Sequence, residues 1–120
     1  MNPFYLLLPA AAYLIGSIPF GLVLTRGQGI DIRQHGSGNI GATNVSRLLG
    51  KKLGLLTLLL DAAKGGLPML VAALLLPAEE PNRYVIIALC GGAAVLGHMF
   101  SLFLRFQGGK GVATALGVFI

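Results

Sequence analysis

Three long apolar runs dominate this sequence and restrict what it can fold into. Residues 4–24 and residues 84–104 contain no charged side chain, and residues 53–76 contain only Asp61 and Lys64. A helix needs about 20 mainly apolar residues to cross a bilayer. A fourth run begins at Gly111 and reaches Ile120. The sequence therefore predicts an all-α, polytopic transmembrane bundle with three full spans and the start of a fourth.

The composition supports a membrane protein and excludes other classes. Of the 120 residues, 55% are hydrophobic and 11% are charged, and the mean hydropathy is +0.81. Soluble domains carry about 25% charged residues, and disordered chains are poor in apolar residues, so neither class fits. The net charge of +5 is spread between apolar runs, which argues against nucleic-acid binding. We expect a single integral-membrane domain over residues 1–120, truncated at the C-terminus.

The basic residues predict the orientation of the chain. Residues 25–52 carry five Lys or Arg side chains against one Asp, and residues 105–110 carry Arg105 and Lys110. Basic loops stay on the cytoplasmic side of a membrane. We therefore expect the loops at residues 25–52 and 105–110, both rich in glycine, to face the cytoplasm. The N-terminus and residues 77–83 are then expected on the outer side of the membrane.

Residues 35–47, HGSGNIGATNVSR, form the first glycine-rich segment. Glycine lets backbone N–H groups turn toward a ligand, and consecutive N–H groups in tight turns bind anions. Ser, Thr and Asn side chains add donors, and Arg47 can bind phosphate through two parallel hydrogen bonds. We interpret the segment as a phosphate-binding loop, and the alternative is an ordinary polar linker.

Asp61 and Lys64 interrupt the apolar run at residues 53–76 and share one helix face, because they are three residues apart. Charges within a span are costly and usually face a bundle interior or water. The pair is either part of a site or a self-neutralising pair that extends to the membrane interface. Gly65, Gly66 and Pro68 follow and predict a bend or a close helix contact.

Residues 97–114, GHMFSLFLRFQGGKGVAT, form the second glycine-rich segment. Glycines surround Lys110 at the start of an apolar run, and a glycine-rich backbone, a lysine and a helix N-terminus together favour anion binding. Thr114, one turn later, is expected at the same site. His98 lies in an apolar stretch and is either a hydrogen-bonded structural residue or a general base. Cys90 is expected to serve packing alone.

Taken together, SGNIGATNVSR, DAAKGGLP and GHMFSLFLRFQGGKGVAT resemble the bacterial acyl-phosphate–glycerol-3-phosphate acyltransferases, the PlsY family. The resemblance implies a bacterial inner-membrane enzyme of phospholipid synthesis. It would transfer a fatty acyl group from acyl phosphate to the 1-hydroxyl of glycerol 3-phosphate, giving lysophosphatidic acid and phosphate. It also implies no metal, no cofactor and no acyl-CoA. The partners are the two substrates and the lipid bilayer, without nucleic acid.

The resemblance assigns residues to the two motifs. The catalytic candidates are Ser37, Arg47, His98 and Lys110. The candidates for substrate and phosphate binding are Gly38, Asn39, Thr43, Asn44, Lys64, Gly108, Gly109, Gly111 and Thr114. No covalent acyl-serine is implied, because Ser37 has no identifiable His or Asp partner. The family has a third motif in a later segment, so an inactive fragment is one alternative, and an anion or phosphate transport module is another.

Overall fold

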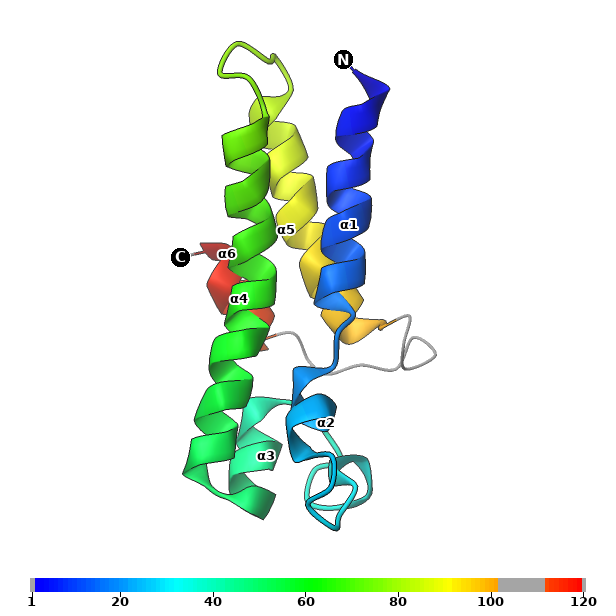
Figure 1. Cartoon of the computed structure of the whole chain (residues 1–120), viewed down its shortest axis with the longest axis vertical. Coiled ribbons are helices and arrows are strands. Elements are labelled where there is room, and N and C mark those ends of the chain that lie inside the picture. The colour runs from blue at the N-terminus through cyan, green and yellow to red at the C-terminus, as the bar shows by residue number, and fades with distance from the viewer. Residues whose placement is uncertain (1, 102–111, 120) are drawn as a thin grey trace.

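The computed structural model describes residues 2–101 and 112–119, and every regular element in that part of the chain is helical. Helices α1 (Leu7–Gly16), α4 (Lys51–Leu75) and α5 (Arg83–Met99) lie side by side along the long axis (Figure 1). The molecule measures 50 × 26 × 19 Å along its principal axes. The predicted all-α bundle is therefore confirmed.

The first apolar run, which the sequence predicts to be a membrane span, forms two helices with a break between them. A 3-10 turn, η1 (Pro3–Leu6), leads into α1, and α2 covers Phe20–Thr25. Pro19 has no backbone N–H, and its ring disfavours a helical conformation of Ile18. The helix therefore stops after Gly16, and residues 17–19 form a break between α1 and α2.

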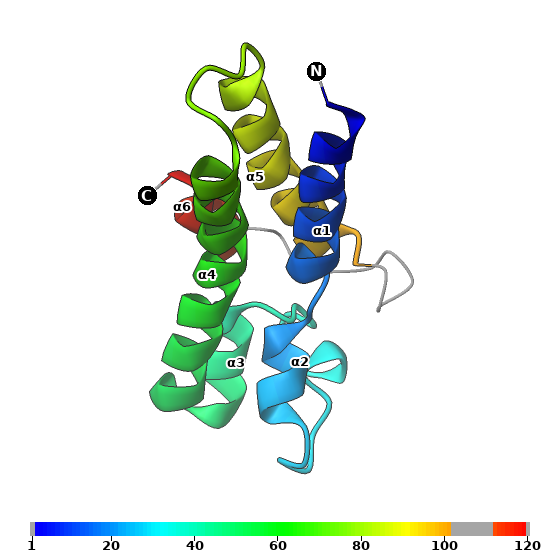
Figure 2. The ribbon, with the colours of Figure 1, turned by 45° about the horizontal axis from the view of Figure 1, so that its top comes forward.

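The lower end of the molecule consists of α2, the 3-10 turn η2 (Ile32–Gln34) and α3 (Ala42–Leu49), which lie below α1 and beside the start of α4 (Figure 2). Buried Ile32, Ile40 and Val45 form a small apolar cluster there and hold the loop against α3. Gly50, with φ of +99°, lets the chain reverse from α3 into α4.

Helix α4 contacts each of the other described α-helices. Its buried residues recur every three or four positions, as one helix face requires. From the lower end upward they are Gly54, Thr57, Asp61, Lys64, Gly65, Pro68 and Ala72. The stretch from Gly54 to Ala72 is about 27 Å long at 1.5 Å per residue. This buried stripe therefore connects α3 at one end with the upper core at the other.

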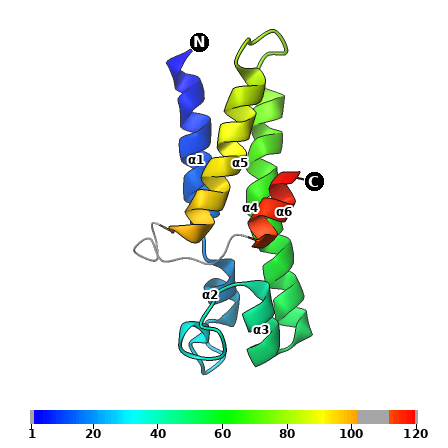
Figure 3. The ribbon, with the colours of Figure 1, turned by 180° about the vertical axis from the view of Figure 1, so that it is seen from behind.

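Small residues let the helices approach closely. The backbone of Gly97 in α5 packs against α1 near Tyr13, and Gly65 of α4 packs against the carbonyl of Thr114 in α6 (Val112–Phe119). Seen from behind, α6 lies against α4 beside α5 (Figure 3). The close contact predicted from Gly65 and Gly66 is confirmed. Cys90 is buried in the upper apolar core beside Ala72.

Two segments are long and apolar enough to cross a membrane, Pro3–Thr25 with its break and Lys51–Leu75. Helix α5 is apolar too, but its 17 described residues extend about 25 Å. Large apolar side chains cover the outside of the bundle, as 72% exposure of Phe4 and 76% exposure of Leu74 illustrate. An apolar exterior of this kind suits a lipid environment.

Candidate functional site

Asn44 organises the first glycine-rich segment from within. Its amide Nδ2 donates to the carbonyls of Ile32 (2.9 Å), Asn39 (2.9 Å) and His35 (3.2 Å), and its Oδ1 accepts from the backbone N–H of Ser37 at 3.1 Å. The side chain is buried, with 1% of the residue exposed. Both amide donors are therefore used in shaping the loop around α3.

The loop's two positive-φ glycines make this arrangement possible. Gly36 (φ +57°) leaves no room for a side chain, because a Cβ there would collide with the Asn44 amide oxygen. Gly38 (φ +74°) passes close to the carbonyl of Arg33. Asn39 Oδ1 then accepts from the N–H of Gly41 at 2.8 Å, which completes the turn into α3. The predicted tight turns are thus present.

The predicted phosphate-binding side chains of this segment divide between a loop and a helix. Ser37 is exposed in the loop, and its hydroxyl accepts from the N–H of Asn39 at 3.3 Å. Thr43 and Arg47 lie one turn apart on α3, where both are exposed. They line a shallow hollow of about 510 Å³ between α3 and the start of α4. Part of the segment that the sequence suggested was loop is therefore helical.

Lys64 lies at the centre of a buried polar cluster in the middle of the bundle. Its Nζ donates to the carbonyl of Ile18 at 3.0 Å, contacts His98 Nδ1 at 2.6 Å and lies 3.1 Å from Asp61 Oδ1. The contact with Asp61 is an ion pair without the alignment of a hydrogen bond. The ring of Phe20 covers the ammonium at 5.8 Å. The pair is buried rather than extended to the membrane interface.

The contact with Lys64 assigns a tautomer to His98. An ammonium carries three donors and no acceptor, so His98 Nδ1 must accept and the ring proton lies on Nε2. In this arrangement Nδ1 is not free to remove a proton from a substrate. The catalytic role of His98 and the phosphate-binding role of Lys64 stay predictions, made at positions where 4% and 3% of the residue is exposed.

Two further bonds join the ends of α1 and α5. The Tyr13 hydroxyl donates to the carbonyl of Phe100 at 2.7 Å, and the Ser101 hydroxyl donates to the carbonyl of Ser17. Ser17 and Ser101 are each 1% exposed. Sequence reasoning missed these residues. The signal that could have found them is Pro19 within an apolar run, since a break there leaves carbonyls that need donors.

Thr114 is the described member of the second motif on α6. It is fully buried against Gly65 of α4, and its hydroxyl finds no hydrogen-bond partner in the described part of the chain. The other predicted residues of that motif, Gly108, Gly109, Lys110 and Gly111, lie outside the described residues. Among residues 2–101 and 112–119, no three His, Cys, Asp or Glu side chains gather as a metal site would need.

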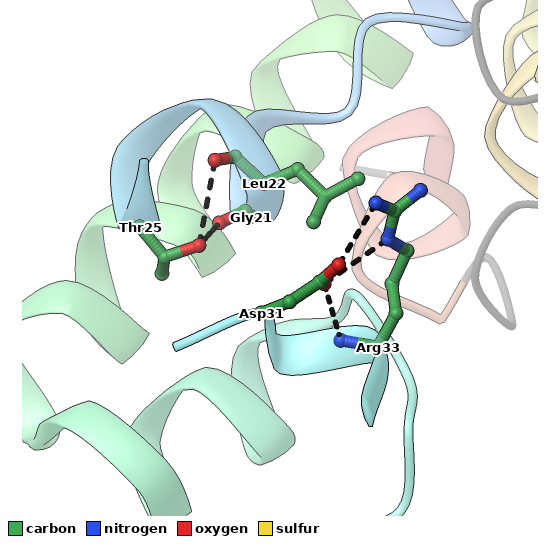
Figure 4. A network of polar contacts seen from close by, with 5 residues as sticks. All are labelled: Gly21, Leu22, Thr25, Asp31 and Arg33. Carbon is green, nitrogen blue, oxygen red and sulfur yellow. Dashed lines mark hydrogen bonds and ion pairs between the residues drawn. The ribbon is translucent and has the colours of Figure 1, made fainter. Parts of the chain in front are cut away.

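A second hollow, of about 680 Å³, lies beside α2 and is lined by Arg26, Asp31 and Arg33. Asp31 pairs with Arg33 at 2.9 Å, and the Thr25 hydroxyl donates to the carbonyl of Gly21 at 2.7 Å (Figure 4). Hydrogen bonds from the Arg33 side chain and N–H hold the pKa of the Asp31 carboxyl below its usual value. The same pairing raises the pKa of the Arg33 guanidinium.

The structure thus brings the candidate residues together in groups. Ser37, Asn39 and Asn44 share the loop, Thr43 and Arg47 share the hollow on α3, and Lys64 contacts His98 in the bundle. The groups are linked through α2. Its Gly21 packs against the carbonyl of Ile40 and near Thr57, one turn below Asp61 on the buried face of α4.

The sequence is similar to one family throughout. A family model described as glycerol-3-phosphate acyltransferase matches residues 6–120. The glycerol-3-phosphate acyltransferase of Desulfotalea psychrophila is 61% identical over 93% of this chain and 56% of its own length. That of Myxococcus xanthus is 60% identical over 90% of this chain and 55% of its own length. The chain spans about half the length of the curated relatives it matches.

The fold is similar to solved structures of PlsY (YgiH), an integral membrane glycerol 3-phosphate acyltransferase. Its glycerol 3-phosphate form matches with a TM-score of 0.85 and 50% identity, over 95% of this chain and 55% of that chain. Its lysophosphatidic acid form matches with a TM-score of 0.83 and 49% identity, over 96% of this chain and 55% of that chain. The apolar exterior described above therefore belongs to a membrane-embedded fold.

Proposed function

Because this chain belongs to the glycerol-3-phosphate acyltransferase family, we propose that it transfers a fatty acyl group from acyl phosphate to glycerol 3-phosphate. An ester bond forms at the 1-hydroxyl, the acyl–phosphate bond breaks, and the products are lysophosphatidic acid and phosphate. The observation that carries the proposal is the similarity to PlsY in a glycerol 3-phosphate form and a lysophosphatidic acid form. These two molecules are a substrate and a product of the proposed reaction.

Both substrates carry phosphate, and we assign the basic groups to it. Arg47 is exposed on α3 with Thr43 one turn away, so both face solvent where a polar substrate arrives. Arg47 and Lys110 bind the phosphates, Ser37 orients the acceptor hydroxyl, and the glycines at 108, 109 and 111 supply backbone donors. Asn39, Gly38 and Asn44 keep the loop in shape, as their contacts support.

An apolar groove between α1 and α4 is our candidate for the acyl chain. It holds about 290 Å³ and is lined by side chains such as Leu8, Ala11, Ala63 and Val71, with Lys64 as its charged member. On α4 it extends from Leu60 to Val71, about 16 Å, close to half of the roughly 30 Å hydrocarbon core of a bilayer. An acyl chain in this groove would stay in an apolar environment while its phosphate reaches the loops.

Catalysis in this proposal comes from positioning and charge. Acyl phosphate already carries a good leaving group, so the reaction needs neither a covalent acyl-enzyme nor a cofactor. Bringing the hydroxyl next to the acyl carbon makes the step effectively unimolecular. The cationic groups then stabilise the negative charge that grows on the carbonyl and phosphate oxygens.

The charge distribution supports an orientation in a bacterial inner membrane. Four exposed basic residues belong to α2, α3 or the segments next to them: Arg26, Arg33, Arg47 and Lys51. Exposed Glu79 belongs to the connection between α4 and α5, which lies at the opposite end of the molecule from α2 and α3 (Figure 1). We propose that the basic end faces the cytoplasm, with the N-terminus outside. The soluble substrate then approaches from the cytoplasm and the acyl phosphate from the bilayer.

The test is acyl transfer from palmitoyl phosphate to radiolabelled glycerol 3-phosphate in detergent, with the protein expressed from its complete reading frame. Arg47→Ala should lower kcat/KM about 100-fold, since a bidentate contact to phosphate contributes about 3 kcal/mol. Arg26→Ala removes an equal charge outside the assigned residues and should keep the wild-type rate. Equal rates in both variants would contradict the assignment. Phosphate flux into liposomes without acyl transfer would favour a transporter instead.

A further inference from the structure

Buried side chains join the two places where the chain leaves the bundle. Helix α1 stops before residues 17–19, and α5 stops before Phe100. Tyr13 of α1 donates to the Phe100 carbonyl, and Ser101 donates back to the Ser17 carbonyl. A side chain near the end of α1 therefore bonds to the backbone that follows α5, and a side chain that follows α5 bonds to the backbone that follows α1. We name the following residues the cross-brace: Tyr13, Asp61, Lys64, His98 and Ser101.

The third bond of the cross-brace is charged. Lys64 Nζ donates at 3.0 Å to the Ile18 carbonyl, which also accepts from the Phe20 N–H at 3.1 Å. The ammonium is in turn compensated by Asp61 at 3.1 Å and by His98 at 2.6 Å. Burying an ion pair usually costs as much free energy as the attraction returns. Stability alone therefore does not account for a charged group at this position.

The positions of these hydrogen bonds in the sequence suggest a role for the charged Lys64 side chain. The break at residues 17–19 leads through α2 into the first glycine-rich segment. Ser101 leads directly into residues 102–111, which contain Lys110. Lys64 contacts the first break and also His98, which lies two residues before Phe100, where α5 has ended. The Lys64 ammonium on α4 thus contacts the Ile18 carbonyl, which precedes α2 and the first glycine-rich segment, and His98, which lies near the start of the second.

We propose that Asp61, Lys64 and His98 are positioning residues. Lys64, held by the other two, fixes the α1–α2 break against α5 and so holds the first glycine-rich segment, which follows α2, in position for a phosphate-bearing substrate. The Lys64 side chain is 1% exposed, and its ammonium contacts the Ile18 carbonyl, His98 and Asp61 within the protein, so it acts through the backbone of Ile18 rather than on substrate. The kinetic consequences rest on the acyltransferase function proposed above.

The decisive variant is Asp61→Leu/Lys64→Met, which replaces the ion pair by apolar side chains of similar shape. Lys64→Met alone leaves a buried carboxylate unpaired and should lower the unfolding temperature. The double variant should recover the wild-type unfolding temperature, yet raise KM for glycerol 3-phosphate about 10-fold, because one hydrogen bond from a charged donor is lost. Leu70→Met on the exposed face of α4 is the control for both readouts.

Amide hydrogen exchange gives a readout that needs no activity. The backbone amides of residues 17–26 should exchange about 10-fold faster in the double variant, because the hydrogen bond from Lys64 to the Ile18 carbonyl is lost. Faster exchange in the double variant supports the positioning role even if no form of the protein transfers acyl groups. That combination of results would contradict the proposed function but not the positioning role. Wild-type KM with wild-type exchange in a stable double variant would overturn the inference.

His98 offers an independent pair of variants, which also covers the case of a double variant that does not fold. In His98→Asn the amide oxygen takes the place of Nδ1 and still accepts from Lys64, whereas His98→Leu removes the acceptor. His98→Asn should keep kcat within about 3-fold of wild type with an unchanged pH profile, and His98→Leu should lose about 10-fold or more. Equal, large losses in both would assign proton transfer to His98 and overturn the inference.

Discussion

At the residue scale, Asn44 is the strongest single determinant of the loop. Replacing this buried side chain by Ala removes the hydrogen bonds to the Ser37 N–H and to the carbonyls of Ile32 and Asn39, whereas the His35 carbonyl keeps the Gly38 N–H as a donor. We expect Asn44→Ala to destabilise the protein by about 2–4 kcal/mol, since each unsatisfied group costs about 1–3 kcal/mol. Thermal unfolding in detergent measures this. Thr43→Ala, an exposed neighbour on α3, should change stability by less than about 0.5 kcal/mol, and a similar loss in both would contradict the assignment.

The Asp31–Arg33 pair makes a prediction about pH. Arg33 lowers the pKa of Asp31, so the pair's contribution is present above the unfolded-state pKa and is lost as pH falls through the lower folded-state pKa. Because the pair is exposed, solvent screens it and the gain in stability is small. In Arg33→Gln the pKa of Asp31 should return toward its usual value. The carboxyl ¹³C shift of Asp31 during an acid titration measures it, and an unchanged midpoint would refute the cause.

The polar residues of the candidate site could be predicted from the sequence, but the contacts that define their roles could not. The sequence identified Asn44 as a polar residue of a phosphate-binding loop, but it could not tell that the amide points inward to the loop's own backbone. That depends on Ile32 and Val45 packing beneath the loop, which are contacts between residues far apart in sequence. Lys64 and Asp61 were predicted to share a face. Their partner His98 lies 34 residues away on another helix, and no local pattern reveals such a contact.

At the scale of elements, glycine contacts set the distance between helices. A Cβ at Gly65 would collide with the Thr114 carbonyl of α6, whereas a Cβ at Gly92 of α5 would meet nothing within 4 Å. Gly65→Ala should therefore destabilise by about 1–3 kcal/mol through overpacking. Gly92→Ala should stabilise by about 0.5–1 kcal/mol through its better helix propensity. Unfolding temperatures in one detergent compare the two, and a shift in the same direction would contradict the close contact.

The elements were predictable where apolar length decides them and less so where single residues do. Lys51–Leu75 follows from the length of its apolar run, within which Asp61 and Lys64 are the charged residues. The break at residues 17–19 is a consequence of Pro19, whose effect competes with the strong apolar signal around it. Helix α3 was hidden among Gly, Asn and Ser residues that favour turns, and it forms because Val45 and Leu48 pack against the lower core.

At the scale of the whole molecule, polar and apolar features are separated along the long axis. Exposed Arg26, Arg33, Arg47 and Lys51 and both candidate hollows on polar segments lie at the end with α2 and α3, whereas the groove lies between α1 and α4 higher in the bundle. The cross-brace lies between these two regions, since Lys64 also lines the groove. A substrate with a phosphate at one end and an acyl chain at the other matches this division.

The groove predicts how acyl-chain length is selected. Ala11 of α1 lines the groove, while its neighbour Ala10 is exposed and outside the lining. In Ala11→Phe the added ring takes up apolar space that a long chain would occupy, so kcat/KM for palmitoyl phosphate should fall about 10-fold, equivalent to about 1.4 kcal/mol. Octanoyl phosphate should react as in wild type, because a short chain does not reach the ring. Ala10→Phe is the matched control and should leave the ratio of the two substrates unchanged. A wild-type ratio in Ala11→Phe would place the acyl chain elsewhere, and the proposed reaction itself would stand, because both substrates would still be consumed.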